Sequence, residues 1–217
     1  MTPAIHLSNR VAGPARWALV ALAAATLLGA CAPLVVGGAM VGGALMVTDR
    51  RTSGAQVEDQ AIELKAANRV REAVGDRGHF NITSYNRAVL ITGEAATEAD
   101  RTAVEQAVGK VENLRSVLNE TAVMGSSSLT SRSSDTFISG RVKAAFVDAK
   151  DMHANAFKVV TERGVVYLMG RVTEREATRA TDIARGIPGV LKVVRVFEIL
   201  TEAELADLQR KTEPAKK

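Results

Sequence analysis

The chain has 217 residues, with 28 Lys and Arg against 24 Asp and Glu and a formal net charge of +4. Arg10 and Arg16 supply half of this net charge, and only 4% of the residues are aromatic. A nearly neutral body with few rings for base stacking argues against nucleic-acid binding. The length allows one large or two small domains.

Residues 1–30 have the pattern of a secretory signal. Arg10 and Arg16 lie in a segment without acidic residues, residues 17–28 are apolar and uncharged, and two small residues then precede Cys31. A basic start, a short apolar run and a small-residue exit are typical of such signals. The apolar run is shorter than the roughly 20 residues that a membrane-spanning helix needs. We therefore predict that residues 1–30 are removed.

Cys31 is the one cysteine in the sequence. A buried core thiol is a common fate for a free cysteine, but the four residues from Leu28 to Cys31 resemble the lipobox of bacterial lipoproteins, Leu-x-(Gly/Ala)-Cys. That resemblance implies cleavage before Cys31, a diacylglycerol on its sulfur and acylation of the new amine. Several acyl chains together anchor a protein stably. Ala32 follows Cys31 where inner-membrane lipoproteins carry Asp, which implies sorting to the outer membrane.

Residues 31–57 are predicted to be a lipid-proximal tether. Residues 32–47 are apolar and uncharged, whereas residues 48–57 are mostly polar. Gly38 and Gly42 form a GxxxG, a pattern that packs helices together within membranes. Because glycine lowers helix propensity, we favour a flexible tether, with self-association through the glycines as the alternative.

Residues 59–123 and 135–200 are two copies of one unit, separated by a Ser-rich linker at 125–134. An internal duplication is a strong indication of domain organisation. The matched positions include Asp59 with Asp135, Ile62 with Ile138, Phe80 with Phe157, Gly93 with Gly170, and the segment 111–120 with the segment 187–196.

Each copy is predicted to contain a helix, two strands, a second helix and a third strand. The first helices carry apolar residues at helical spacing, and tight turns at 85–87 and 162–164 join two β-branched strands. Before the second helices, Thr173 with Glu176 forms a capping box and Thr97 with Asp100 a weaker version of one. The third strands are predicted at 115–123 and 190–199, and a helical crossover before them makes a mixed sheet. The predicted core residues of the first helices are Ile62, Ala66, Val70 and Ala73 in the first copy and Ile138, Val142, Ala145 and Phe146 in the second.

This α-β-β-α-β unit, its apolar strand ending in Gly93 or Gly170, and the segment "VYLMGRVTEREA" resemble the BON domain. With the lipobox and the Gly-rich lead, the chain is similar to dual-BON lipoproteins of the outer membrane. The resemblance implies an α+β fold of two tandem BON domains, each with two helices packed on one face of a three-stranded mixed sheet. The domains are then 58–124 and 135–200, followed by a tail at 201–217 with a short capped helix over 201–210, and the two glycines are structural.

The resemblance also implies a function. BON domains have no known catalytic role. In dual-BON lipoproteins the second domain binds anionic phospholipid, and the proteins support envelope integrity and gather at division sites. The implied location is the periplasmic face of the outer membrane, and the implied partners are the anionic membrane and outer-membrane assembly or division-site proteins.

A search of the sequence for catalytic or metal-binding groups finds none. His79 and His153 precede the first strand of each copy, are expected to be exposed loop residues, and have no second histidine at metal-ligand spacing. The acidic pairs Glu98/Asp100 and Glu174/Glu176 fall in the first turns of helices, where carboxylates offset the helix dipole. No nucleophile or phosphate-binding motif is present. We expect neither an enzyme nor a cofactor, apart from the lipid on Cys31, and no metal site.

The two copies differ in charge. Residues 59–123 carry eight basic and ten acidic residues, whereas residues 135–200 carry eleven basic and eight acidic ones. Each Lys or Arg near an anionic membrane surface contributes about 1 kcal/mol. The second copy is therefore the better match for such a surface, although an ordinary solvated surface would also explain the excess.

The first helix of the second copy has a second apolar stripe, opposite its core stripe at 100° per residue. Apolar groups with basic edges suit the membrane interface, while packing of Phe137 against the other domain or the linker is the alternative. The position that matches Phe137 in the similar lipoproteins is aromatic and contacts lipid. The stripe consists of Phe137, Gly140, Ala144 and Val147, flanked by Arg141 and Lys143, where the first copy has Ala61, Leu64, Asn68 and Arg71.

The predicted phospholipid-binding residues are accordingly Phe137, Arg141, Lys143, Ala144 and Val147. The alternative function is a protein-interaction adaptor, in which the same patch docks an outer-membrane assembly or envelope-remodelling factor. The next candidate for the membrane contact is the second helix, with Arg175 and Arg179.

Overall fold

The computed structural model describes residues 49–212, which belong to the compact unit Met46–Lys217. The predicted signal at 1–30, Cys31 and the GxxxG segment lie outside the described residues, as do residues 213–217 of the predicted tail. Among the helices of this described range, none is both long enough and apolar enough to cross a membrane.

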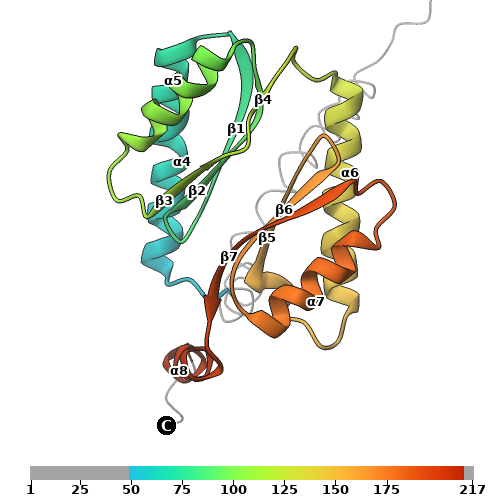
Figure 1. Cartoon of the computed structure of the whole chain (residues 1–217). Helices are drawn as coiled ribbons and strands as arrows, with labels where there is room; N and C mark the ends of the chain where they lie inside the picture. Colours follow the sequence, from blue (N-terminus) through green and yellow to red (C-terminus); the bar gives the residue numbers. More distant parts are fainter. Residues whose placement is uncertain (1–48, 213–217) are drawn as a thin grey trace, which may run out of the picture. The chain divides into compact units, whose positions relative to one another are not determined.

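The first copy folds as a helix, a hairpin, a second helix and a further strand that is split in two. β1 is antiparallel to β2, while β3 and β4 both run parallel to β2. α4 and α5 lie on one face of this sheet (Figure 1). The elements are α4 (Ser53–Val74), β1 (Gly78–Tyr85), β2 (Ala88–Ala95), α5 (Glu98–Gly109), β3 (Ser116–Asn119) and β4 (Ala122–Val123).

The single strand predicted at 115–123 is wrong in one respect, because it breaks between Asn119 and Ala122. The side-chain oxygen of Asn119 accepts a hydrogen bond from the backbone N–H of Thr121 at 3.1 Å. Such a turn competes with the strand ladder, so pairing with β2 resumes only at β4.

The second copy repeats this order with a continuous third strand. β5 is antiparallel to β6, and β7 is parallel to β6, so the predicted mixed sheet is confirmed. α6 and α7 cover one face of the sheet (Figure 1). The elements are α6 (Leu129–Asp148), the 3-10 helix η1 (Ala154–Ala156), β5 (Phe157–Glu162), β6 (Val165–Thr173), α7 (Glu174–Arg185), β7 (Lys192–Leu200) and α8 (Glu202–Thr212).

Side-chain caps fix where the helices begin. The predicted caps of Thr97 and Thr173 are confirmed, since each hydroxyl accepts from the backbone N–H three residues later. Thr52 and Ser128 cap α4 and α6 in the same way. Both first helices therefore begin inside the segments that were predicted as tether and linker. Their first turns are polar and show no apolar periodicity, so the sequence pattern did not identify them as helical.

Each pair of helices encloses a core with its sheet. Ile62, Ala66 and Val70 are buried as predicted, but Val74 takes the place predicted for Ala73, which is exposed. The i, i+4 spacing of the earlier residues continues straight to Val74. In the second copy the predicted core residues Ile138, Val142 and Phe146 are buried and Ala145 is half-buried.

The central strands β2 and β6 are buried on both faces. Val89 and Ile91 of β2 pack under α4 and α5, whereas Leu90 points to the other face. There Leu90 and Tyr85 form one apolar cluster with Tyr167 and Met169 of β6. Strands buried on both faces read as continuous apolar runs, which explains the sequences of β2 and β6.

The structural glycines lie where two backbones meet. Gly93 has a φ of 111°, and a Cβ on it would lie 2.0 Å from the carbonyl oxygen of His79. A Cβ on Gly170 would lie 2.5 Å from the carbonyl oxygen of Ala156. The prediction of a strand end beneath the second helix is wrong, since β2 and β6 continue to Ala95 and Thr173. The close neighbour is the start of β1 for Gly93 and the end of η1, directly before β5, for Gly170.

A carboxylate on each first helix holds the hairpin turn of its own copy. Asp59 accepts from the N–H groups of Asn86 and Arg87, both at 2.7 Å. Asp135 accepts in the same way from Arg163 and Gly164, both at 2.8 Å. All four turn residues have positive φ, a geometry that extra hydrogen bonds help to hold. Burial alone would raise the pKa of Asp59, but the hydrogen bonds that it accepts lower it below its usual value.

Candidate functional site

The far-side stripe of α6 is exposed. Phe137 is 72% exposed and Val147 is 71% exposed, and Gly140 and Ala144 are exposed as well. Ile138, one residue further along the helix, is buried in the core. This confirms the prediction that Phe137 lies off the core stripe. It excludes the alternative in which Phe137 packs against the other domain or the linker within the described residues.

A shallow hollow lies along this stripe. It is lined by Thr136, Phe137, Gly140, Arg141 and Ala144. A Cβ on Gly140 would meet no atom within 4 Å, so the hollow is open above this residue. The ring of Phe137, the open space above Gly140 and the guanidinium of Arg141 therefore lie in one depression.

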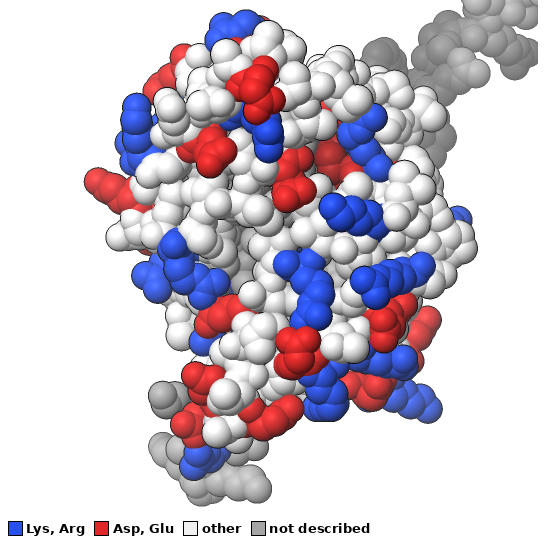
Figure 2. All heavy atoms as spheres, viewed as in Figure 1, with Lys and Arg blue, Asp and Glu red and all other residues white. Residues whose placement is uncertain are grey.

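The charge of Arg141 is available to a ligand. Seven of the eleven basic residues counted in the second copy have a carboxylate within 4.0 Å, and Arg141, Lys143, Lys150 and Lys192 have none among the described residues. A free cation keeps its full attraction for an anionic surface. Figure 2 shows acidic and basic residues interspersed on the face it presents, so the unpaired groups matter more than the net charge.

The next candidate, α7, is weaker on the same grounds. Arg179 forms an ion pair with Asp151 at 3.0 Å, and Arg175 lies 3.9 Å from Glu202. Both pairs are exposed and individually weak, yet each cation already has an acidic neighbour. α6 therefore remains the better candidate for an anionic surface.

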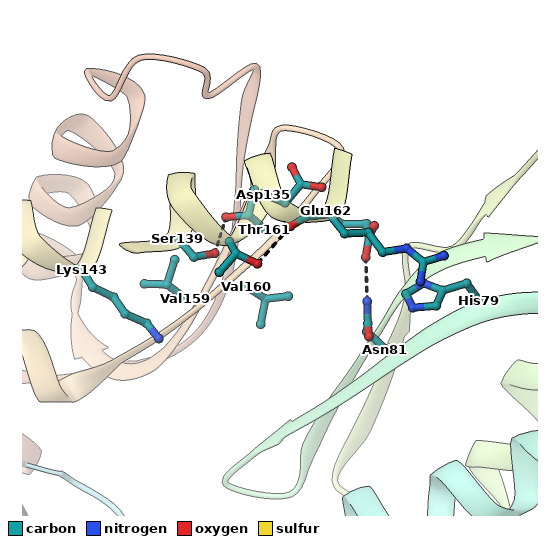
Figure 3. A pocket seen from close by; sticks show the side chains of 11 residues that line it. His79, Asn81, Asp135, Ser139, Lys143, Val159, Val160, Thr161 and Glu162 are labelled. Carbon is teal, nitrogen blue, oxygen red and sulfur yellow. Dashed lines mark hydrogen bonds between the residues drawn. The ribbon is translucent and has the colours of Figure 1, made fainter. Parts of the chain in front are cut away.

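The structure separates the two predicted basic residues. Lys143 does not line the hollow with Phe137 and Arg141 but lies at a second pocket, which Ser139 and Val159 also line (Figure 3). These separate positions agree with the prediction that Arg141 and Lys143 flank the stripe. The two lie on opposite sides of the stripe because two residues turn about 200° around a helix.

The second pocket lies between β1 of the first copy and α6 and β5 of the second (Figure 3). Asn81 donates to Glu162 at 2.9 Å across it, and Ser139 donates to Thr161 at 2.8 Å. Burial raises the pKa of Glu162, and the hydrogen bond from Asn81 opposes this shift. The first hydrogen bond joins the two copies and the second lies within the second copy, so these polar groups have structural partners.

The two histidines lie in different surroundings. His79 lies within β1 rather than in the predicted exposed loop, and its Nδ1 is 3.9 Å from Glu94 Oε2. His153 is exposed, as expected. No group of three or more possible metal ligands occurs in the part of the chain that the structure describes.

The matching face of α4 differs from the stripe on α6. Leu64 is 66% exposed, but Asn68 and Arg71 occupy the positions of Ala144 and Val147 and hydrogen-bond to each other at 3.3 Å. The first copy therefore lacks the aromatic ring and also the apolar residues at the C-terminal end of the stripe.

Comparison with known proteins identifies relatives for the whole folded part. The BON domain family matches residues 58–125 and 134–201. The chain is 37% identical over 191 residues to the outer membrane lipoprotein DolP of Haemophilus influenzae, covering 86% of this chain and 97% of the relative. It is 29% identical over 151 residues to a 21 kDa hemolysin of Actinobacillus pleuropneumoniae, covering 69% and 78%. Among solved structures, CdsD of the type III secretion system of Chlamydia trachomatis matches at 12% identity and a TM-score of 0.28. The match covers 69% of this chain and 99% of that chain, and it is too distant to bear on this site.

Proposed function

This chain belongs to the BON-domain family, and we propose that it is an outer-membrane lipoprotein, anchored through Cys31, whose second BON domain binds anionic phospholipid. Its two BON domains and its similarity to DolP over nearly all of both chains support a place in the cell envelope. The lipobox supports the anchor, and Ala32 supports the outer membrane with the folded part in the periplasm. We further propose that the protein supports envelope integrity at division sites, by binding and without catalysis.

The observation that carries the phospholipid proposal is the hollow on α6. Phe137 and Val147 would insert among acyl chains, with Gly140 and Ala144 as the small residues between them. Arg141 would bind the head group, because no described carboxylate competes for it. Lys143, on the other flank, would add long-range attraction only.

The expected strength suits a domain that is already tethered. Inserting one aromatic side chain contributes roughly 1.5–3 kcal/mol, and each basic group near the surface adds about 1 kcal/mol. A total of about 4 kcal/mol corresponds to a dissociation constant of about 1 mM. A short flexible linker raises the effective concentration to the millimolar range. The anchored domain would therefore dock and release readily.

Vesicle flotation tests this proposal. The chain from residue 31 onward, carrying Cys31→Ser so that no acyl group holds it, is mixed with phosphatidylglycerol-rich or with purely zwitterionic vesicles. We expect co-flotation with the anionic vesicles alone, weakened by salt. Absence of flotation from both would contradict the proposal and favour the adaptor function, in which a protein occupies the hollow.

A further inference from the structure

A second exposed apolar side chain lies beside α6, in the loop between α7 and β7. Leu191 is 80% exposed, more than any other large apolar side chain that the structure describes. Lys192 follows it and has no carboxylate within 4.0 Å among the described residues. An exposed leucine next to a free cation has the same chemistry as Phe137 beside Arg141.

The loop is held firmly. The backbone N–H of Leu191 donates to the carbonyl of Gly164 at 2.8 Å. Its side chain lies over that glycine, where an added Cβ would come within 2.9 Å of Leu191 Cγ. An added Cβ on Gly189 would lie 3.1 Å from Cδ1 of Ile138 in α6. The exposure of Leu191 is therefore fixed by the fold.

Leu191 lies on the Arg141 side of the stripe. One depression is lined by Leu191, Ser134 and Ile138, among others. At about 100° per residue, Arg141, Ser134 and Ile138 are displaced from Phe137 in the same direction around α6, by about 40°, 60° and 100°. The surface from Phe137 to Leu191 thus crosses Arg141 and Ser134 without an intervening free carboxylate, since Asp135 is occupied by the turn.

The position of Leu191 and Lys192 is occupied differently in the first copy. The repeat places Arg115 opposite Leu191 and Ser116 opposite Lys192, and the N–H of Arg115 makes the equivalent hydrogen bond to Arg87, also at 2.8 Å. Arg115 forms an ion pair with Glu198. The same place in the fold therefore carries a paired cation in one copy and an exposed leucine with a free lysine in the other.

We propose that Leu191 and Lys192 form a second contact with the anionic bilayer, so that the second BON domain binds it at two points. This rests on the proposed function and adds the orientation to it. A helix that lies alone on a membrane can roll about its axis. A second insertion point off that axis, on the Arg141 side, fixes the rotation and holds Arg141 and Lys192 at head-group level.

Single-tryptophan fluorescence tests the contact directly. Trp17 is the one tryptophan of the sequence, so the chain from residue 31 onward with Cys31→Ser has none. Leu191→Trp and Phe137→Trp, each on vesicles of phosphatidylglycerol and phosphatidylethanolamine, should both shift to the blue and be quenched by brominated acyl chains. Leu64→Trp, an exposed leucine of the first copy, is the matched control and should show neither effect.

The binding variant is Leu191→Gln with Lys192→Gln. We expect about tenfold weaker binding to the anionic vesicles, equivalent to about 1.4 kcal/mol, and no change for Leu64→Gln. If Leu191→Trp stays unquenched while Phe137→Trp is quenched, the second contact is wrong and the phospholipid proposal stands. If the unsubstituted chain does not bind the vesicles, the proposed function itself fails.

Discussion

The residues that lead into α4 clasp both copies, and removing one of them makes a sharp prediction. Arg50 donates to both carboxylate oxygens of Glu176 at 2.7 and 2.6 Å, and Arg50 and Arg171 exchange side-chain to backbone hydrogen bonds. Arg51 bonds Asp59 at 2.9 Å. The sequence predicts these residues as part of a flexible tether. The structure places them in the fold, so Arg50→Ala should destabilise it.

The magnitude follows from the burial of Glu176, which is only 4% exposed. Burial alone would raise its pKa, but the hydrogen bonds from Arg50 and Thr173 lower the pKa from 4.5 to about 2. A shift of this size corresponds to roughly 3 kcal/mol. Removing one partner of a buried ion pair typically costs about 3–5 kcal/mol. We therefore expect Arg50→Ala to lower the free energy of unfolding by about 3 kcal/mol.

Urea unfolding at pH 7 measures this loss. With a slope of about 2 kcal/mol per molar urea, the midpoint should fall by about 1.5 M. Arg185→Ala is the matched control, since its pair with Asp182 at 3.8 Å is exposed and should contribute little. Adding Glu176→Gln to Arg50→Ala should recover part of the loss, because the unpaired buried charge is then gone.

The pH dependence gives an independent check. A lowered pKa contributes stability that is fully present above about pH 4.5 and is lost as the pH falls toward 2. The difference in stability between the unsubstituted chain and Arg50→Ala should therefore shrink over that interval. A loss below about 0.5 kcal/mol at pH 7, unchanged on acidification, would refute the buried clasp.

Three further predictions concern the anchor, the glycines and the cations. Cys31→Ala should abolish labelling by a fatty-acid analogue in cells, and equal labelling would disprove the lipid anchor. Gly93→Val and Gly170→Val should each lower the melting temperature, because the new Cβ meets a carbonyl oxygen and overpacking typically costs roughly 1–3 kcal/mol of unfolding free energy. Unchanged melting would contradict that placement. Arg141→Ala should weaken binding to anionic vesicles more than Lys143→Ala, and both losses should diminish at high salt, whereas equal losses would argue against the separate positions of the two cations.

The order of elements could be predicted from the sequence because its signals are local. Helical and strand periodicity, the capping residues Thr97 and Thr173, and the turns at 85–87 and 162–164 each act within a few residues. Because the unit is duplicated, each of these patterns occurs twice at matching positions, which supports its interpretation. The exposure of Phe137 also followed from its angle around α6 relative to Ile138.

The features that were missed depend on contacts between distant residues. The sequence around Arg50 is typical of a linker, and nothing near it in the sequence indicates its partner. That partner is Glu176, which lies far along the chain. Asp59 and Asp135 match in the repeat, but their role appears only once the hairpin turns fold back onto them.

The central claim is that Phe137 inserts into an anionic bilayer, and the most direct measurement is flotation of Phe137→Glu. The substitution removes the inserted ring and places a carboxylate against the head groups. We predict that binding to phosphatidylglycerol-rich vesicles is lost while the melting temperature is unchanged, because Phe137 is 72% exposed. Ala61→Glu, the matching change in the first copy, should bind normally. A folded Phe137→Glu chain that floats like the unsubstituted one would contradict the claim.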